Sequence, residues 1–168
     1  GPIFEPNTPL RVKLDRGEIT PVDHDVEADM FGMVRDILQA NGFEQYEISN
    51  YARFGFECQH NLLYWMNQSW WPFGPAAAGH LNGRRWRNRP RLSDYLKTVG
   101  LPHVEDVEVL LPDQRAGEAF LVGLRVINGM DRKWVDALIE ESTDRWRAQV
   151  IDRFVDENLL HWKNDHLA

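Results

Sequence analysis

YEISNYA at positions 46–52, followed by ECQHNLLYW at positions 57–65, is the stretch of sequence that decides the fold of this chain. Alternating apolar and polar residues over 46–49 predict a strand, and the residues from 60 onward predict a helix. Helical spacing places His60 and Tyr64 on one line and Asn61 and Trp65 on the adjoining line. An imidazole, a carboxamide, a phenol and an indole therefore project from one arc of a strand–loop–helix unit, which suits a flat, partly polar ligand.

Composition limits the classes of protein that this chain can represent. Its 168 residues fit one ordinary domain, or one incomplete domain plus a small one. A hydrophobic content of 43% and a charged content of 27% are typical of soluble globular proteins. The net charge of -7 argues against a general nucleic-acid binder, because phosphate contacts need a basic surface. No apolar run approaches the roughly 20 residues of a membrane span, and no export signal is recognisable.

The single cysteine, Cys58, is informative about compartment and chemistry. One cysteine forms no internal disulfide, so a reducing cytoplasm is the expected location. One thiolate also cannot replace the several that hold an iron–sulfur cluster. Cys58 lies two residues before His60, and it is either a redox-active or ligating thiol or a buried, inert one.

Periodicity predicts two kinds of architecture along the chain. A helix over residues 23–40 followed by a strand over 43–49 is the order found in a parallel α/β sheet. Residues 101–112 are predicted to be a linker, because they combine prolines with an acidic cluster. Helices over 113–127, 131–139 and 143–157, followed by a hairpin, predict a winged-helix-like domain over 113–168 whose wing is truncated by the end of the chain.

The order and spacing of four motifs is recognisable: EISNYA, CQHNLLYW, FGPAAAGH at 73–80 and RRWRN at 84–88. Together they resemble the HemW-type haem chaperones, which are radical S-adenosylmethionine (SAM) proteins related to oxygen-independent coproporphyrinogen III oxidase. The HNLLYW run looks like the signature that separates this type from the oxidases. The resemblance covers nearly all of the chain but only the C-terminal part of such a protein, so residues 1–100 are expected to form the last units of a partial TIM-like radical SAM barrel.

The resemblance implies a parent protein that binds haem and delivers it to acceptor proteins. Two alternatives stay open: a coproporphyrinogen III oxidase-like enzyme of porphyrin biosynthesis, and a non-catalytic ligand- or protein-binding module. A 4Fe-4S cluster and SAM are expected for the full-length parent. They are not expected for this fragment, because it lacks the Cys-x-x-x-Cys-x-x-Cys motif, and no catalytic residue is assigned here. The missing N-terminal half of the barrel is therefore an expected partner.

The resemblance also proposes roles for the polar and aromatic residues. His60 is either the ligand of the haem iron or a helix N-terminal residue bonded to backbone. Asn61, Tyr64 and Trp65 either line the face of a porphyrin or pack the helix on a sheet, and packing is favoured for Trp65. Asn50 follows a predicted strand, where barrel enzymes place ligand-binding residues, but it could instead cap the loop.

The glycine-bearing loop departs from the family pattern. A Gly-x-Gly-x-Gly-Ala-His sequence is expected where the backbone approaches SAM, whereas this chain has Pro72, Ala76 and Ala78. Pro72 lacks an N–H donor and Ala76 adds a methyl group. Gly74 survives from the pattern together with Ala77, and it is the loop's candidate cofactor-binding residue.

Five arginines occur among the eight residues 84–91, against an acidic background. On a strand, Arg85 and Arg87 share one face at a spacing of roughly 6.8 Å, so they could clamp the two propionates of a porphyrin. The alternatives are a solvated face paired with nearby acids and a phosphate-binding strip. The acidic third helix of the C-terminal domain argues against nucleic acid as the partner.

An incomplete barrel is also expected to associate with other chains. It would leave a parallel strand edge without a partner, and such edges recruit other strands. The sequence therefore predicts a homodimer through residues 46–49, or a fragment that is ordered only beside its missing half.

Overall fold

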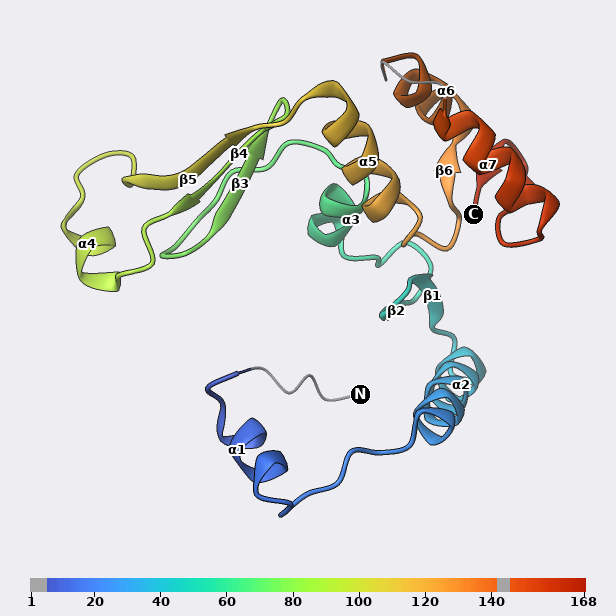
Figure 1. Ribbon diagram of the computed structural model, residues 1–168, viewed down its shortest axis with the longest axis horizontal. Helices are drawn as coiled ribbons and strands as arrows, with labels where there is room; N and C mark the ends of the chain where they lie inside the picture. The colour runs from blue at the N-terminus through green and yellow to red at the C-terminus, as the bar shows by residue number, and fades with distance from the viewer. Residues whose placement is uncertain (1–5, 142–145) are drawn as a thin grey trace. The chain divides into compact units, whose positions relative to one another are not determined.

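The structure, a computed structural model, describes residues 6–141 and 146–168. It contains two compact units, Gly1–Glu44 and Gln45–Ala168. Helices in the first unit are α1 (Pro9–Asp15) and α2 (His24–Ala40) (Figure 1). The strands and the remaining helices follow from Glu44 onward.

Helix α2 forms where the sequence predicts it. Asp23 caps its first turn, since the Asp23 side chain accepts a hydrogen bond from the backbone N–H of Asp25. Its end is set by Asn41 and Gly42, the latter with a positive φ of 79°. The prediction of a helix over residues 23–40 is therefore confirmed. None of its residues is buried, so the apolar stripe that the sequence shows is left exposed.

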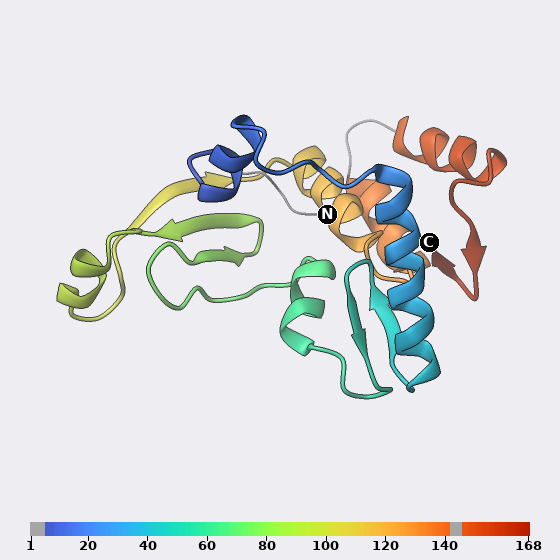
Figure 2. The ribbon, with the colours of Figure 1, turned by 90° about the horizontal axis from the view of Figure 1, so that it is seen from below.

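The predicted strand at the start of the second unit is one arm of a hairpin. β1 (Glu44–Glu47) and β2 (Asn50–Ala52) lie side by side, joined by two residues (Figure 2). The other side of β1 pairs with the segment after helix α5: the N–H of Ile48 donates to the carbonyl of Arg125, and the N–H of Ile127 to that of Tyr46, both at 3.1 Å. The open parallel edge predicted at residues 46–49 is therefore wrong, because distant residues occupy it.

A three-stranded antiparallel sheet follows helix α3 (Gln59–Trp65) and consists of β3 (Ala78–Leu81), β4 (Arg84–Asn88) and β5 (Val104–Val109). Helix α4 (Leu92–Lys97) connects β4 to β5. The predicted linker over 101–112 is thus largely a strand. Glu105 and Glu108 of this strand lie opposite Arg87 and Arg85 of β4 in the ladder, so the acidic composition marks strand pairing here. Both three-stranded sheets among the described residues are antiparallel. The parallel arrangement is predicted only from the helix and strand over residues 23–49.

The C-terminal part combines three helices with a small sheet. Its elements are α5 (Pro112–Gly123), β6 (Met130–Asp131), α6 (Arg132–Glu141), α7 (Trp146–Asp156), β7 (Trp162–Lys163) and β8 (His166–Leu167). The strands pair antiparallel in the order β6-β8-β7, so the last strand lies in the middle. The three predicted helices are present, although α5 ends four residues early and the predicted start of the third lies outside the described residues.

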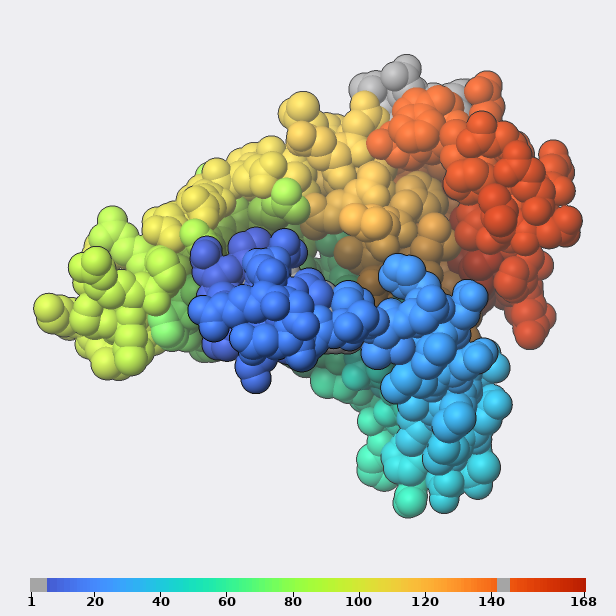
Figure 3. All heavy atoms as spheres, turned by 60° about the horizontal axis from the view of Figure 1, so that its bottom comes forward, coloured from blue at the N-terminus to red at the C-terminus, as the bar shows by residue number. Residues whose placement is uncertain are grey.

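One hydrophobic core lies in this C-terminal part, and Figure 3 shows its helices as one continuous mass of side chains. Its buried members come from all three helices and from strands β6 and β8: Ala116, Ala119, Met130, Val135, Leu138, Ile151 and Leu167. Two glycines allow close approach here. A Cβ on Gly123 would lie 2.8 Å from the side chain of Met130, and one on Gly129 would lie 2.2 Å from the carbonyl oxygen of Leu167.

Two glycine-to-alanine changes test this packing in opposite directions. Gly129→Ala should lower the free energy of unfolding by at least about 2 kcal/mol, since the new methyl overlaps backbone and the φ of 75° is unfavourable for alanine. Gly117→Ala should raise it by up to about 1 kcal/mol, because Gly117 lies within helix α5 and its Cβ would meet only the Arg147 side chain at 3.6 Å. Urea denaturation followed by circular dichroism measures both, and equal effects would contradict the packing described.

Candidate functional site

An exposed histidine stands in the first turn of helix α3. Cys58 is the N-cap residue of this helix, and its side chain makes no capping hydrogen bond. The His60 Nε2 lies 2.9 Å from the phenol oxygen of Tyr64, one turn further along, and the two rings meet edge to face. His60 and Tyr64 thus share one line of the helix, as the sequence predicts. The hydrogen bond fixes the orientation of an imidazole that solvent can reach.

The pair continues into a short series of aromatic rings. Tyr64 packs edge to face on Trp70, with ring centroids 4.4 Å apart, and Trp70 lies 4.9 Å from the ring of His80. Backbone hydrogen bonds join Trp70 and His80 across a β-bridge, and His80 is only 5% exposed. Trp70 and His80 are neighbours of the site that the sequence does not predict, because the bridge that brings them together joins separate segments.

Glu47 of β1 is completely buried, and its carboxylate organises the hairpin. One oxygen accepts hydrogen bonds from the backbone N–H of Ser49 and from the side-chain amide of Asn50. The other lies 3.4 Å from the guanidinium of Arg125. Asn50 therefore stabilises the turn, which is the capping role that the sequence left open, and it begins β2 instead of following the end of a barrel strand.

Arg125 links this carboxylate to the other line of helix α3. Its guanidinium carbon lies 4.4 Å from the ring centroid of Trp65, a cation–π contact. Asn61 donates a long hydrogen bond of 3.5 Å to the phenol oxygen of Tyr46. Asn61 and Trp65 thus face β1 and Arg125, whereas His60 and Tyr64 face Trp70. The four residues predicted to form one arc are divided between a packed side and an accessible side, with Trp65 in the packing role favoured from sequence.

Backbone groups of the loop around Gly74 are hydrogen-bonded to neighbouring residues. The N–H of Gly74 donates to the hydroxyl of Tyr95 at 3.0 Å, and the carbonyl of Gly74 accepts from the amide of Asn88 at the same distance. The N–H of Ala76 donates to the carbonyl of Arg89, and Ala76 has a φ of 59°. With these groups engaged inside the loop, the residues present do not form a backbone cradle for SAM.

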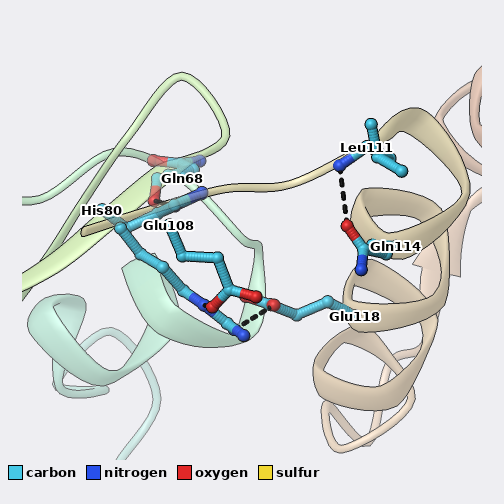
Figure 4. A network of polar contacts seen from close by, with 7 residues as sticks. Gln68, His80, Glu108, Leu111, Gln114 and Glu118 are labelled. Carbon is cyan, nitrogen blue, oxygen red and sulfur yellow. Dashed lines mark hydrogen bonds and ion pairs between the residues drawn. The ribbon is translucent and has the colours of Figure 1, made fainter. Parts of the chain in front are cut away.

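Arg85 and Arg87 share one face of β4, as predicted, and carboxylates surround both. Arg85 pairs with Glu108 at 2.7 Å and with Glu118 of helix α5, and the carboxylates of these two glutamates lie close together (Figure 4). The hydrogen bond with Glu108 raises the pKa of Arg85 above its ordinary value, against the lowering effect of partial burial. Arg87 pairs with Glu105 at 3.0 Å and with Asp106 at 2.7 Å. This is the alternative in which nearby acids neutralise the arginine face.

Figure 4 also shows how helix α5 begins beside these ion pairs. The side-chain oxygen of Gln114 accepts a hydrogen bond of 2.9 Å from the backbone N–H of Leu111. Helix α5 therefore has a fixed start, and it holds Glu118 next to Arg85.

The metal chemistry available to this chain is limited. Cys58 is exposed, so the prediction that it could be a buried, inert thiol is wrong. Within residues 6–141 and 146–168, no group of three or more histidine, cysteine or acidic side chains could hold a metal ion. A 4Fe-4S cluster does not fit the residues present, because it needs several thiolates and the chain has one.

Among the described helices, none combines the length and the apolar character needed to span a bilayer.

Relatives among curated proteins match almost the whole chain. A haem chaperone HemW of Bacillus subtilis is 32% identical over 162 residues, which make up 95% of this chain and 42% of that protein. A haem chaperone HemW of Mycobacterium tuberculosis is 33% identical over 169 residues, 99% of this chain and 41% of that protein. The mitochondrial radical S-adenosyl methionine domain-containing protein 1 of Mus musculus is 37% identical over 76 residues, 45% of this chain and 17% of that protein.

The chain therefore spans about two-fifths of the length of the two HemW relatives. No protein-family model matches the chain, and no solved structure matches it. The relationship of this chain to the HemW proteins therefore rests on its sequence similarity to those curated proteins.

Removing the buried carboxylate of Glu47 should destabilise the β1–β2 hairpin next to helix α3. Glu47→Ala leaves Ser49, Asn50 and Arg125 without their shared acceptor, so we expect the free energy of unfolding to fall by about 2–4 kcal/mol. Glu44→Ala on the same strand is the matched control and should cost less than about 0.5 kcal/mol, since Glu44 is exposed. Chemical denaturation compares the two variants, and similar losses in both would refute a special role for Glu47.

Proposed function

The chain is a HemW-type sequence related to the C-terminal part of these haem chaperones, and on this premise we propose that it supplies the haem-binding surface of such a protein. In this proposal the parent protein holds haem as cargo and passes it to acceptor proteins. The chain described here contributes helix α3 and the elements that support it.

The observation that carries the proposal is the exposed imidazole of His60, held in place by Tyr64. Histidine is a common axial ligand of haem iron, and a hydrogen bond to one ring nitrogen orients the ring and leaves the other nitrogen for the metal. In the tautomer in which Nε2 carries the proton and donates it to the Tyr64 oxygen, Nδ1 is the nitrogen that would meet the iron. The rings of Tyr64 and Trp70 offer an aromatic surface beside it. Asn61 and Trp65 support the helix from its packed side.

Enzymatic activity is not part of this proposal for the chain alone. Reductive cleavage of SAM needs a cluster, and the single thiol and the closed Gly74 loop do not provide for either group. The oxidase alternative, and the 4Fe-4S cluster and SAM of the family, belong to a parent with further residues. The HNLLYW run, which contains the His60–Tyr64 pair, favours the chaperone.

We further propose that the N-terminal unit and the β1–β2 region belong to a TIM-like radical SAM barrel completed by the rest of a longer parent. Two facts support this. The chain spans about two-fifths of its HemW relatives, and helix α2 carries an apolar stripe of Val26, Met30, Val34 and Ile37 that is 49–56% exposed. The missing part of the barrel is the partner that this stripe suits. A homodimer through residues 46–49 loses its support, because β1 is paired on both sides.

The C-terminal part is proposed to be a winged-helix-like domain. Three helices, a short strand before the second helix and a terminal hairpin, with the strand order β6-β8-β7, support this assignment. The net charge of -7 favours a role in packing or in partner binding over one in nucleic-acid binding. A cytoplasmic location remains part of the proposal, supported by the lone, exposed Cys58.

Haemin titration tests the proposed ligand. The wild-type chain should give a sharpened, shifted Soret band, and His60→Ala should weaken haemin binding by at least about tenfold, because it removes the axial nitrogen. His161→Ala is the matched control, since His161 is also exposed but lies near β7, in another part of the second unit. Far-ultraviolet circular dichroism should be unchanged in both variants. Equal binding by His60→Ala and the wild type would remove His60 from the mechanism.

A further inference from the structure

The sheet formed by β3, β4 and β5 has two chemically different faces. Because side chains alternate along a strand, Arg84 and Trp86 project from the face opposite to Arg85 and Arg87. The cross-strand register keeps small or apolar residues beside them: Leu81 lies opposite Arg84, and Gly79 lies opposite Trp86. One face of the sheet therefore carries paired charges, and the other is largely apolar.

The apolar face is hollowed into a groove of about 370 Å³. Trp71 and Trp86 form its aromatic wall, with ring centroids 5.5 Å apart and planes inclined at 69°. A Cβ on Gly79 would lie 2.7 Å from the Trp86 ring, so the glycine allows this indole to lie flat across β3. The volume is within the range of small-molecule sites.

The apolar side chains of the groove remain open to solvent. Leu81 is 43% exposed, Val104 46% and Leu101 72%, and Trp71 is 44% exposed. A contiguous apolar patch of this kind is unusual on a protein surface unless a ligand or a partner covers it. Aromatic walls and aliphatic sides suit a planar, largely apolar molecule.

A single cation, Arg84, lies at the groove. Arg85 and Arg87, its neighbours on the strand, each pair with two carboxylates, whereas Arg84 has no acidic partner within the described parts of the chain. An exposed guanidinium beside an apolar groove is suited to bind a carboxylate on an otherwise apolar ligand, because it offers parallel N–H donors.

We propose that this groove binds a planar macrocycle bearing carboxylates, the chemical class of the tetrapyrroles. Trp71 and Trp86 contact the ring, and Arg84 pairs with a carboxylate at its edge. The inference rests on the proposed haem cargo and assigns the carboxylate contact to Arg84, in place of the neutralised Arg85 and Arg87. Among the described residues, no histidine, cysteine or acidic residue lines the groove, so it recognises the ring and the carboxylate, and not the iron.

Metal-free protoporphyrin IX is the probe that isolates this site. Titrating it into the 168-residue chain should shift its absorbance and quench tryptophan fluorescence. Arg84→Gln should weaken binding about tenfold, the effect expected from the loss of one charge-assisted pair. Arg91→Gln, which makes the same change of charge outside the groove, should bind like the wild type. The dimethyl ester of the porphyrin has no carboxylate, so its affinity should be the same for the wild type and Arg84→Gln.

A second variant tests the apolar wall. Leu81→Ser replaces an exposed leucine opposite Arg84 and should also weaken the free-acid porphyrin severalfold, with the thermal melt unchanged. Equal affinities of the wild type, Arg84→Gln and Leu81→Ser for the porphyrin would overturn the proposal, as would the absence of binding to the wild type.

The two proposals fail in different ways. Loss of haemin binding in His60→Ala, with porphyrin binding indifferent to Arg84→Gln, would overturn the groove and leave the haem ligand in place. Porphyrin binding that depends on Arg84, with haemin indifferent to His60→Ala, would support the groove and remove His60. His60→Ala should not change the affinity for the metal-free porphyrin, because that probe has no iron to ligate.

Discussion

The buried carboxylate of Glu47 is the constraint on which the arrangement around the candidate site depends. A carboxylate without access to water is strongly destabilising unless charged or hydrogen-bonding partners surround it. Here the partners come from three places: the turn at Ser49, the amide of Asn50 and the guanidinium of Arg125 after helix α5. Satisfying one buried charge therefore fixes the β1–β2 hairpin and ties it to a segment nearly eighty residues away.

Arg125 extends this constraint to helix α3. Its contact with Trp65 holds one side of the helix against the hairpin, and the adjoining side, with His60 and Tyr64, is left accessible. The division explains why a short helix of seven residues can present an imidazole in a defined orientation. The contacts that support helix α3 are buried and electrostatic. His60, the proposed ligand of the iron, is exposed one helical turn away from them.

Local signals in the sequence were sufficient to predict helices α2, α3 and α6, but not helix α1. Asp23 and Asn41-Gly42 mark the ends of α2, and the spacing of His60 and Tyr64 foretold their shared line. What the sequence did not reveal depends on pairing between distant segments. Residues 101–112 have the composition of a linker, and only the arginines of β4 give their acidic residues the role of strand partners. Likewise, nothing near residue 47 indicates that residues 125–127 close its free edge.

The same limit applies to the proposed binding residues. Alternation correctly placed Arg85 and Arg87 on one face of the strand, but the choice of carboxylate-binding face depended on which side Glu118 of helix α5 would approach. The structure places two ion-paired arginines on that side and an open aromatic groove on the other. Helix α3 and this groove are thus two separate surfaces of the second unit, and they are proposed to bind different parts of the cargo. Helix α3 binds the iron, and the groove binds a carboxylate.

Pulsed electron paramagnetic resonance of the ferric haem complex would detect directly whether the His60 imidazole ligates the iron. The chain would be prepared with ¹⁵N-labelled histidine and loaded with haemin. We expect hyperfine coupling between the iron and a ¹⁵N nucleus of one protein imidazole, which should be absent from His60→Ala and retained in His161→Ala. A spectrum with no protein nitrogen coupling, or one in which the coupling persists without His60, would contradict the proposal that helix α3 provides the ligand of the haem iron.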